Sequence, residues 1–144
     1  MPRNLEKIAL VVAYTKWNEP PRMRHHVTSQ IKSHFEKLIF VEYFPWHSGI
    51  NSLHHHQDNM WILSIYGDGI RWKNWFRFNL LRLHEAFFGR LTLVLQKELE
   101  PFNLGEKKLF LFNFCYDFSQ IYNGYVFNWA SYFCFDEWPR MERN

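Results

Sequence analysis

The sequence predicts an α/β fold in which helices flank a parallel sheet to form a three-layer sandwich. Three observations predict it. Short apolar runs alternate with helical patterns along the chain. The first run, residues 8–13, is apolar at every position, which is typical of a strand buried on both faces. A strand, a helix and a second strand fill the first 45 residues, an order that predicts a right-handed βαβ unit.

The first helix is expected to begin near Pro21, because proline fits a first helical turn, and to extend to about Glu36. Apolar residues recur every four positions along it and form its predicted inner stripe: Met23, Val27, Ile31 and Phe35. Residues 46–59 are polar and rich in histidine, and we expect a loop there.

A long helix is predicted over residues 72–99, where apolar residues follow a helical spacing. Asp117 is a candidate cap for a short helix that ends near Tyr122. Strands are expected at residues 8–13, 38–41, 60–65, 109–114 and 130–135.

The chain has 144 residues, a length that fits one domain, and we expect residues 1–144 to form a single domain. A formal net charge of +3 is too small to predict nucleic-acid binding, which needs a concentrated basic patch.

Cys115 and Cys134 lie in strand-like runs without zinc-site spacing, which favours buried free thiols in a reducing compartment. Neither a membrane span nor a signal-peptide cleavage site is recognisable, so we expect a cytoplasmic protein.

Ligands of open parallel sheets bind beyond the carboxyl ends of the strands. Here those ends are residues 14–17, 43–46, 66–68, 115–117 and 136–138. After the first strand, four basic or histidine side chains surround the start of the first helix: Arg22, Arg24, His25 and His26. Positive side chains oppose the helix macrodipole there, and a bound anion would remove that cost. Either these residues bind an anion, or they are solvated and the cost is tolerated.

Several ligand-binding signatures are missing. No GxGxxG follows the first strand and no GxxxxGK[ST] occurs, so a dinucleotide or triphosphate in the first turn is not expected and no cofactor is predicted. His54, His55 and His56 are adjacent, and three neighbouring loop residues cannot easily point at one ion. We therefore predict no metal site and favour a solvated loop.

Asp136 and Glu137 follow the last expected strand, where these carboxylates either bind a ligand or cap a helix or loop.

The long helix and the turn before it mix basic and aromatic side chains. The basic residues are Arg71, Lys73, Arg77, Arg82 and Arg90, and the aromatic ones include Trp72, Trp75, Phe76 and Phe78. This mixture suits either a membrane interface or a core stripe with a basic solvent face.

Both ends of the chain resemble a known family. "PPRMRHHVTSQI" at residues 20–31, followed by "KLIFVEYFP" at 37–45, resembles the N-terminal domain of family 4-like glycosyltransferases of the GT-B fold. "LFLFNFCYDFSQIYN" at 109–123 and "WASYFCFDEWP" at 129–139 are similar to the strand, short helix and Asp-rich strand end of that family. The His-rich segment 46–59 departs from the family pattern.

The resemblance implies a Rossmann-like domain that forms the acceptor-binding half of a retaining glycosyltransferase in surface polysaccharide biosynthesis. The acceptor would be a glycan or a lipid-linked sugar, and a C-terminal domain absent from this chain would bind the nucleotide sugar, usually without a metal. Asp136 would lie beside the reacting sugar carbon, where it orients the acceptor hydroxyl or stabilises oxocarbenium-like charge. Residues expected to bind substrate are Trp17, Arg22, Arg24, His25, Tyr116 and Glu137.

Two other functions fit the same residues. One is a non-catalytic α/β binding or receiver-like module, although residues 14–17 lack the acidic cluster that a receiver needs. The other is an interaction module that binds the inner face of the membrane through the long helix. On the glycosyltransferase hypothesis this chain alone is expected to be inactive, because a GT-B cleft needs two walls.

Overall fold

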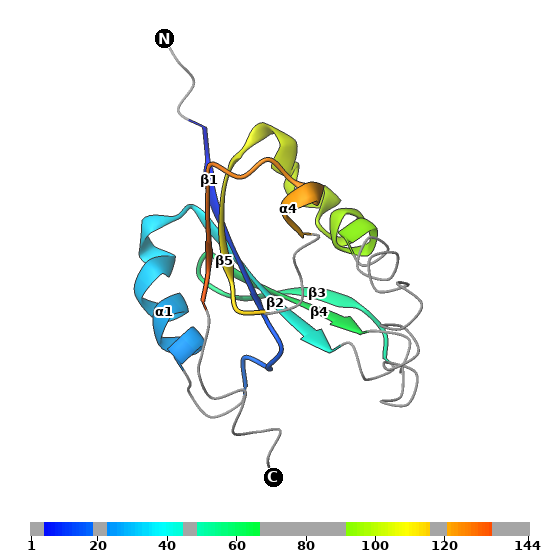
Figure 1. The fold of residues 1–144 in the computed structure, drawn as a ribbon. Helices are drawn as coiled ribbons and strands as arrows, with labels where there is room; N and C mark the ends of the chain where they lie inside the picture. Colours follow the sequence, from blue (N-terminus) through cyan, green and yellow to red (C-terminus); the bar gives the residue numbers. More distant parts are fainter. Residues whose placement is uncertain (1–4, 19–22, 45–48, 67–91, 116–120, 134–144) are drawn as a thin grey trace.

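A central six-stranded sheet organises the computed structural model, which describes residues 5–18, 23–44, 49–66, 92–115 and 121–133 (Figure 1). The strand order is β3-β4-β2-β1-β5-β6. The strands are β1 (Lys7–Ala13), β2 (Lys37–Phe44), β3 (Ser52–Gln57), β4 (Met60–Tyr66), β5 (Lys108–Asn113) and β6 (Trp129–Tyr132).

Five of the six strands are parallel. β1 pairs with β2 and with β5, β4 pairs with β2, and β6 pairs with β5, all in parallel, whereas β3 pairs antiparallel with β4. The α/β architecture is therefore as predicted, but the sheet is mixed rather than wholly parallel. The parallel strands, β4-β2-β1-β5-β6, follow the 3-2-1-4-5 order, which is consistent with a Rossmann-like arrangement.

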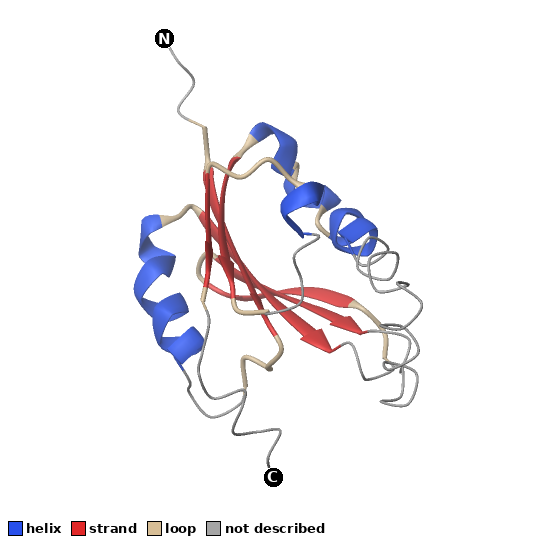
Figure 2. Ribbon diagram, in the orientation of Figure 1, coloured by secondary structure: helices blue, strands red, loops and turns tan. Residues whose placement is uncertain are grey.

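Helices cover both faces of this sheet (Figure 2). The helix α1 (Met23–Ile31) lies on one face and continues into a short 3₁₀ turn, η1 (Lys32–His34). The helical residues 92–98 and the single-turn helix α4 (Ile121–Gly124) lie on the other. Two further 3₁₀ turns, η2 (Glu100–Phe102) and η3 (Leu104–Glu106), lead into β5.

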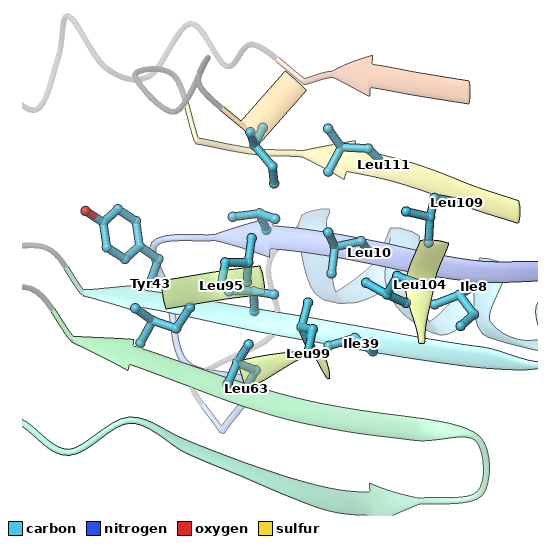
Figure 3. Packing of buried hydrophobic residues seen from close by; sticks show 14 of the residues in the cluster. Ile8, Leu10, Ile39, Tyr43, Leu63, Leu95, Leu99, Leu104, Leu109 and Leu111 are labelled. Atoms are coloured by element: carbon cyan, nitrogen blue, oxygen red, sulfur yellow. The ribbon is translucent and has the colours of Figure 1, made fainter. Parts of the chain in front are cut away.

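The strand β1 is buried on both faces, as its unbroken apolar run predicts. Successive side chains of a strand point to opposite faces. Ile8, Leu10 and Val12 accordingly join the core beneath the 92–98 helix, which contributes Leu95; Leu99, directly after the helix, belongs to the same core (Figure 3). The alternate residues of β1 join a second core beneath α1: Ala9, Val11 and Ala13. Each helix layer thus has its own core, and β1 contributes to both.

The predicted inner stripe of the first helix is wrong at its start. Met23 is 57% exposed, and the buried residues of α1 are His25 and Thr28. Thr28 is tolerated there because its hydroxyl donates a 2.6 Å hydrogen bond to the carbonyl oxygen of Arg24, one turn earlier. The rest of the predicted stripe, Val27, Ile31 and Phe35, is half-buried and packs against the core beneath α1.

The prediction of a loop over residues 46–59 is also wrong, because Ser52–Gln57 forms the edge strand β3. Most of its side chains are exposed, so no apolar alternation marks it in the sequence. A tight turn then connects β3 to β4, with Asp58 at a positive φ of 49°.

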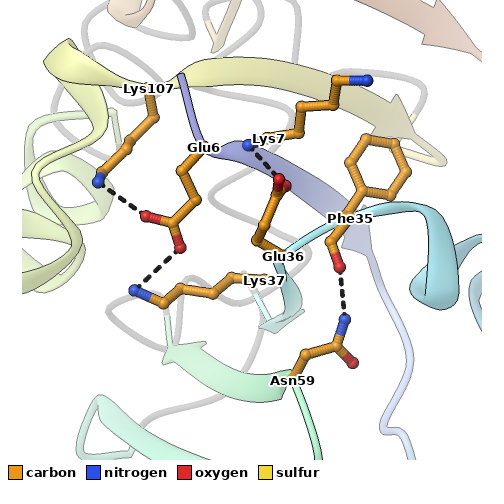
Figure 4. Close-up of polar contacts among 7 residues, drawn as sticks. All are labelled: Glu6, Lys7, Phe35, Glu36, Lys37, Asn59 and Lys107. Atoms are coloured by element: carbon orange, nitrogen blue, oxygen red, sulfur yellow. Dashed lines mark hydrogen bonds and ion pairs between the residues drawn. The ribbon is translucent and has the colours of Figure 1, made fainter. Parts of the chain in front are cut away.

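Side-chain bonds tie the amino edge of the sheet together (Figure 4). Glu6 pairs with Lys107 at 2.7 Å and with Lys37 at 3.2 Å, and its pKa is lowered chiefly by the hydrogen bond from Lys107. The Lys7 amide donates to Glu36 Oε2 at 2.8 Å. Asn59 Nδ2 donates to the carbonyl oxygen of Phe35 at 2.8 Å. The polar side chains in these contacts therefore stabilise the fold at this edge of the sheet.

The helix α4 packs closely on the 92–98 helix at Gly124. A Cβ atom added there would collide with Thr92 Cγ2, which belongs to a stiff β-branched side chain. We expect Gly124→Ala to lower the free energy of unfolding by about 1–3 kcal/mol. Gly105→Ala is the control, since nothing lies within 4 Å of the added atom, and no loss is expected. Urea denaturation measures both, and equal stability of the two variants would contradict the close approach of α4.

Candidate functional site at the carboxyl edge of the sheet

The strand order reverses at β1, and this position selects the candidate site. From β1 the chain moves to β2 on one side, and β5 lies on the other. Val12 and Asn113 are neighbours across β1 and β5, so the segments that follow these strands leave the sheet side by side. Crevices at such a reversal are where open α/β sheets bind ligands. Residues 14–18 and 114–115 are the described parts of these segments.

Trp17 lies at this edge on the face that α1 covers. Its ring contacts the rings of His25 and Phe40, each with centroids 5.1 Å apart, and that of His56 at 6.1 Å. The residue is only half-buried. The structure thus brings together two residues that the sequence predicted for the site, Trp17 and His25.

His25 points inward from the first turn of α1. It is 5% exposed, its ring stacks on Phe40, and its Nε2 lies 3.0 Å from the carbonyl oxygen of Lys16. Because a carbonyl oxygen only accepts, Nε2 carries the proton and donates. The predicted substrate-binding residue His25 is therefore bonded to the loop after β1.

Glu42 belongs to the same cluster, and sequence reasoning missed it. The side chain is 8% exposed. Its Oε2 accepts a 2.5 Å hydrogen bond from the Trp17 amide, and its Oε1 accepts a 2.7 Å bond from Ser64 Oγ on β4. A signal was present in the sequence. Glu42 interrupts the apolar run of β2 on the same face as Leu38 and Phe40, where a charge needs partners.

Arg24, in the first turn of α1, interacts electrostatically with Cys115, which follows β5. Burial raises the pKa of the Cys115 thiol, and the positive charge of Arg24 opposes this shift. The Asn113 side chain accepts a 2.9 Å bond from the Cys115 amide and fixes the turn there. Cys115 is a buried free thiol, as predicted, and its raised pKa keeps it neutral rather than an activated nucleophile.

Two tyrosines line the edge beside Cys115. Tyr14 and Tyr43 have ring centroids 5.7 Å apart, and burial raises the pKa of Tyr43. Both pack against the core beneath the 92–98 helix. Aromatic side chains therefore lie at this edge on both faces of the sheet, with Trp17 on the α1 face and the two tyrosines on the other.

Four predicted site residues lie outside the described residues: Arg22, Tyr116, Asp136 and Glu137. The predicted aromatic and basic segment 71–90 and Cys134 also lie outside them. Their assigned roles stay predictions.

The three adjacent histidines of β3 have different surroundings. The His55 ring packs on Trp61 at 4.7 Å, and its Nε2 lies 2.6 Å from the Asp58 carbonyl oxygen, whereas His56 contacts Trp17. No group of three His, Cys, Asp or Glu side chains that could hold a metal occurs among the described residues. Within the same residues, no helix is long and apolar enough to cross a membrane.

Comparisons with protein families, curated proteins and solved structures find no significant match to this chain.

Proposed function

We propose that this chain is the acceptor-binding domain of a retaining, family 4-like glycosyltransferase of the GT-B fold. The enzyme transfers a sugar from a nucleotide-sugar donor to a glycan or lipid-linked acceptor in surface polysaccharide biosynthesis. A second domain, beyond this chain, binds the donor. The resemblance of residues 20–45 and 109–139 to that family is the origin of this proposal.

The observation that carries it is the wall of side chains at the reversal of strand order. Trp17 lies there half-buried, and the positive charge of Arg24, in the first turn of α1, acts on Cys115 at the end of β5. An indole face packs well on the apolar face of a sugar ring, and a guanidinium binds phosphate or carboxylate oxygens. A phosphorylated or acidic sugar acceptor fits this pair.

The remaining residues complete the proposed site. Arg22, Tyr116 and Glu137 extend the acceptor wall, and Asp136 orients the acceptor hydroxyl or stabilises oxocarbenium-like charge on the transferred sugar. The basic and aromatic segment 71–90 gives the domain a contact with the inner face of the membrane, where a lipid-linked acceptor resides.

The main alternative is a non-catalytic α/β binding module. The strand order weighs against its receiver-like form, since the flavodoxin-like order of receivers is 2-1-3-4-5 whereas the parallel strands here follow 3-2-1-4-5. A module of either kind would bind a ligand without transferring a sugar, so an activity assay separates the hypotheses.

The test is sugar transfer by the full-length protein from a panel of labelled nucleotide sugars to glycan and lipid-linked acceptors. We expect transfer by the wild type, a loss of about 100-fold or more in Asp136→Asn, and none by residues 1–144 alone. Asp58→Asn is the matched control, because Asp58 lies in the β3–β4 turn at a positive φ that asparagine tolerates. Wild-type protein that transfers no sugar would contradict the proposal, and wild-type rates in Asp136→Asn would remove that residue from it.

A further inference from the structure

The peptide unit between Lys16 and Trp17 is held at both ends by buried side chains. Its carbonyl oxygen accepts the hydrogen bond from His25 Nε2 on α1, and its N–H donates to Glu42 Oε2 on β2. Both partners are at most 8% exposed. A peptide unit is planar, so fixing its two polar groups fixes the plane and the position of the Trp17 Cα atom in it. The packing of the Trp17 ring on Phe40 and His25 then holds the direction of the side chain.

Glu42 is held in turn by β4. Ser64 Oγ donates to its second carboxylate oxygen, so both oxygens of Glu42 have a donor. A continuous network of hydrogen bonds therefore runs from α1 through the loop after β1 to β2 and β4. This network of hydrogen bonds connects the loop to three regular elements, and it holds the backbone of Trp17 at the candidate site.

The charge of Glu42 is costly where it lies. Glu42 is the one buried carboxylate among the described residues, and it shares its face with the apolar side chains of Leu38 and Phe40. An apolar side chain at such a position is often as stabilising as a buried, paired charge. What an apolar residue cannot do is accept the Trp17 N–H, so the carboxylate is suited to setting one loop conformation.

We propose that Glu42 and His25 are positioning residues that fix the 16–17 peptide plane and so hold the Trp17 indole ready for the acceptor. This inference rests on the proposed function, because it takes the acceptor as the ligand of Trp17. It also reassigns His25, which acts on the loop rather than on the substrate. Preorganisation of this kind improves binding because less conformational freedom is lost when the ligand arrives.

The test compares Glu42→Ala with Glu42→Gln in the full-length protein. Glutamine can still accept the Trp17 N–H and can donate to Ser64 Oγ, whereas alanine can do neither. In Glu42→Ala we expect hydrogen exchange at the Trp17 amide, followed by NMR, to accelerate about tenfold, and the acceptor KM to rise about tenfold with kcat within about twofold. Glu42→Gln should stay within about threefold of the wild type in both measurements.

Glu36→Ala is the matched control. Glu36 also accepts a backbone N–H, that of Lys7, but at the amino edge of the sheet, so neither Trp17 exchange nor the acceptor KM should change. If Glu42→Ala does not fold, Ser64→Ala removes one donor and keeps the carboxylate. It should shift both measurements in the same direction by about threefold.

Two results would overturn the positioning role while leaving the enzyme in place. One is an unchanged acceptor KM in a folded Glu42→Ala or Ser64→Ala variant whose Trp17 amide exchanges faster. The other is a Glu42→Gln variant as impaired as Glu42→Ala, which would assign the effect to charge rather than to hydrogen-bond geometry. Wild-type protein that transfers no sugar would instead overturn the proposed function, and this inference with it.

Discussion

Leu95→Ala is expected to lower the free energy of unfolding by about 3 kcal/mol. Leu95 is 0% exposed and attaches the 92–98 helix to the sheet, in the core that also holds Leu10 and Leu63 (Figure 3). Truncation to alanine removes apolar contacts and leaves a cavity that a helix packed on a rigid sheet cannot fully close. Urea denaturation of the chain measures the loss, and an unchanged slope with a lower midpoint would show that the substitution changed stability alone.

Leu93→Ala is the control for this prediction, since Leu93 lies two residues away on the same helix and is 66% exposed. Its removal should change the free energy of unfolding by less than about 0.5 kcal/mol. Losses of equal size in the two variants would show that the helix presents a different face to the sheet, and the proposed packing of this layer would then be wrong.

Trp17→Ala is expected to lower kcat/KM for the acceptor about 30-fold in the full-length protein, which corresponds to about 2 kcal/mol. Trp17 is the half-buried aromatic residue of the candidate site, and its ring packs on those of Phe40 and His25. Initial rates at acceptor concentrations far below KM give the ratio directly. Alanine would remove the proposed contact with the acceptor and the packing on the rings of His25 and Phe40.

Trp129→Ala is the matched control. Trp129 is also partly exposed and also packs on one phenylalanine, Phe112, with ring centroids 5.0 Å apart. It pairs with Phe110 in the amino half of β5, however, and so lies away from the carboxyl edge. Its loss should leave kcat/KM within about twofold, because Trp129 lies away from the candidate site. An equal fall in both variants would assign the effect of Trp17→Ala to stability alone.

Strands with strong apolar runs could be predicted from the sequence, because burial on both faces leaves an unbroken pattern. β1 was expected at residues 8–13 and spans Lys7–Ala13, and β5 was expected at 109–114 and spans Lys108–Asn113. β3 could not be predicted this way, because an exposed edge strand has no apolar period. Its histidines adopt a strand conformation because β3 pairs with β4. That pairing is a contact between two strands and does not follow from the β-propensity of the residues themselves.

The candidate site was predictable in location but not in its bonding. The strand-end rule selected Trp17, and the start of the first helix selected Arg24 and His25, all of which lie at the carboxyl edge. The inward direction of His25 was not predictable, because a buried histidine with a carbonyl partner has the same sequence pattern as a solvated one. Glu42 was missed for a related reason. Its partners, the Trp17 amide and Ser64, are 25 and 22 residues away and meet it only in the folded sheet.

Assignment of this chain to the acceptor side is tested most directly by initial rates of sugar transfer with donor and acceptor concentrations varied independently, for wild-type protein and Trp17→Ala. On the proposed function, loss of an acceptor-binding side chain should raise the acceptor KM about tenfold or more. The donor KM should stay within about twofold, because that proposal assigns donor binding to another domain. A rise in the donor KM with an unchanged acceptor KM would place this chain on the donor side instead and contradict the proposal.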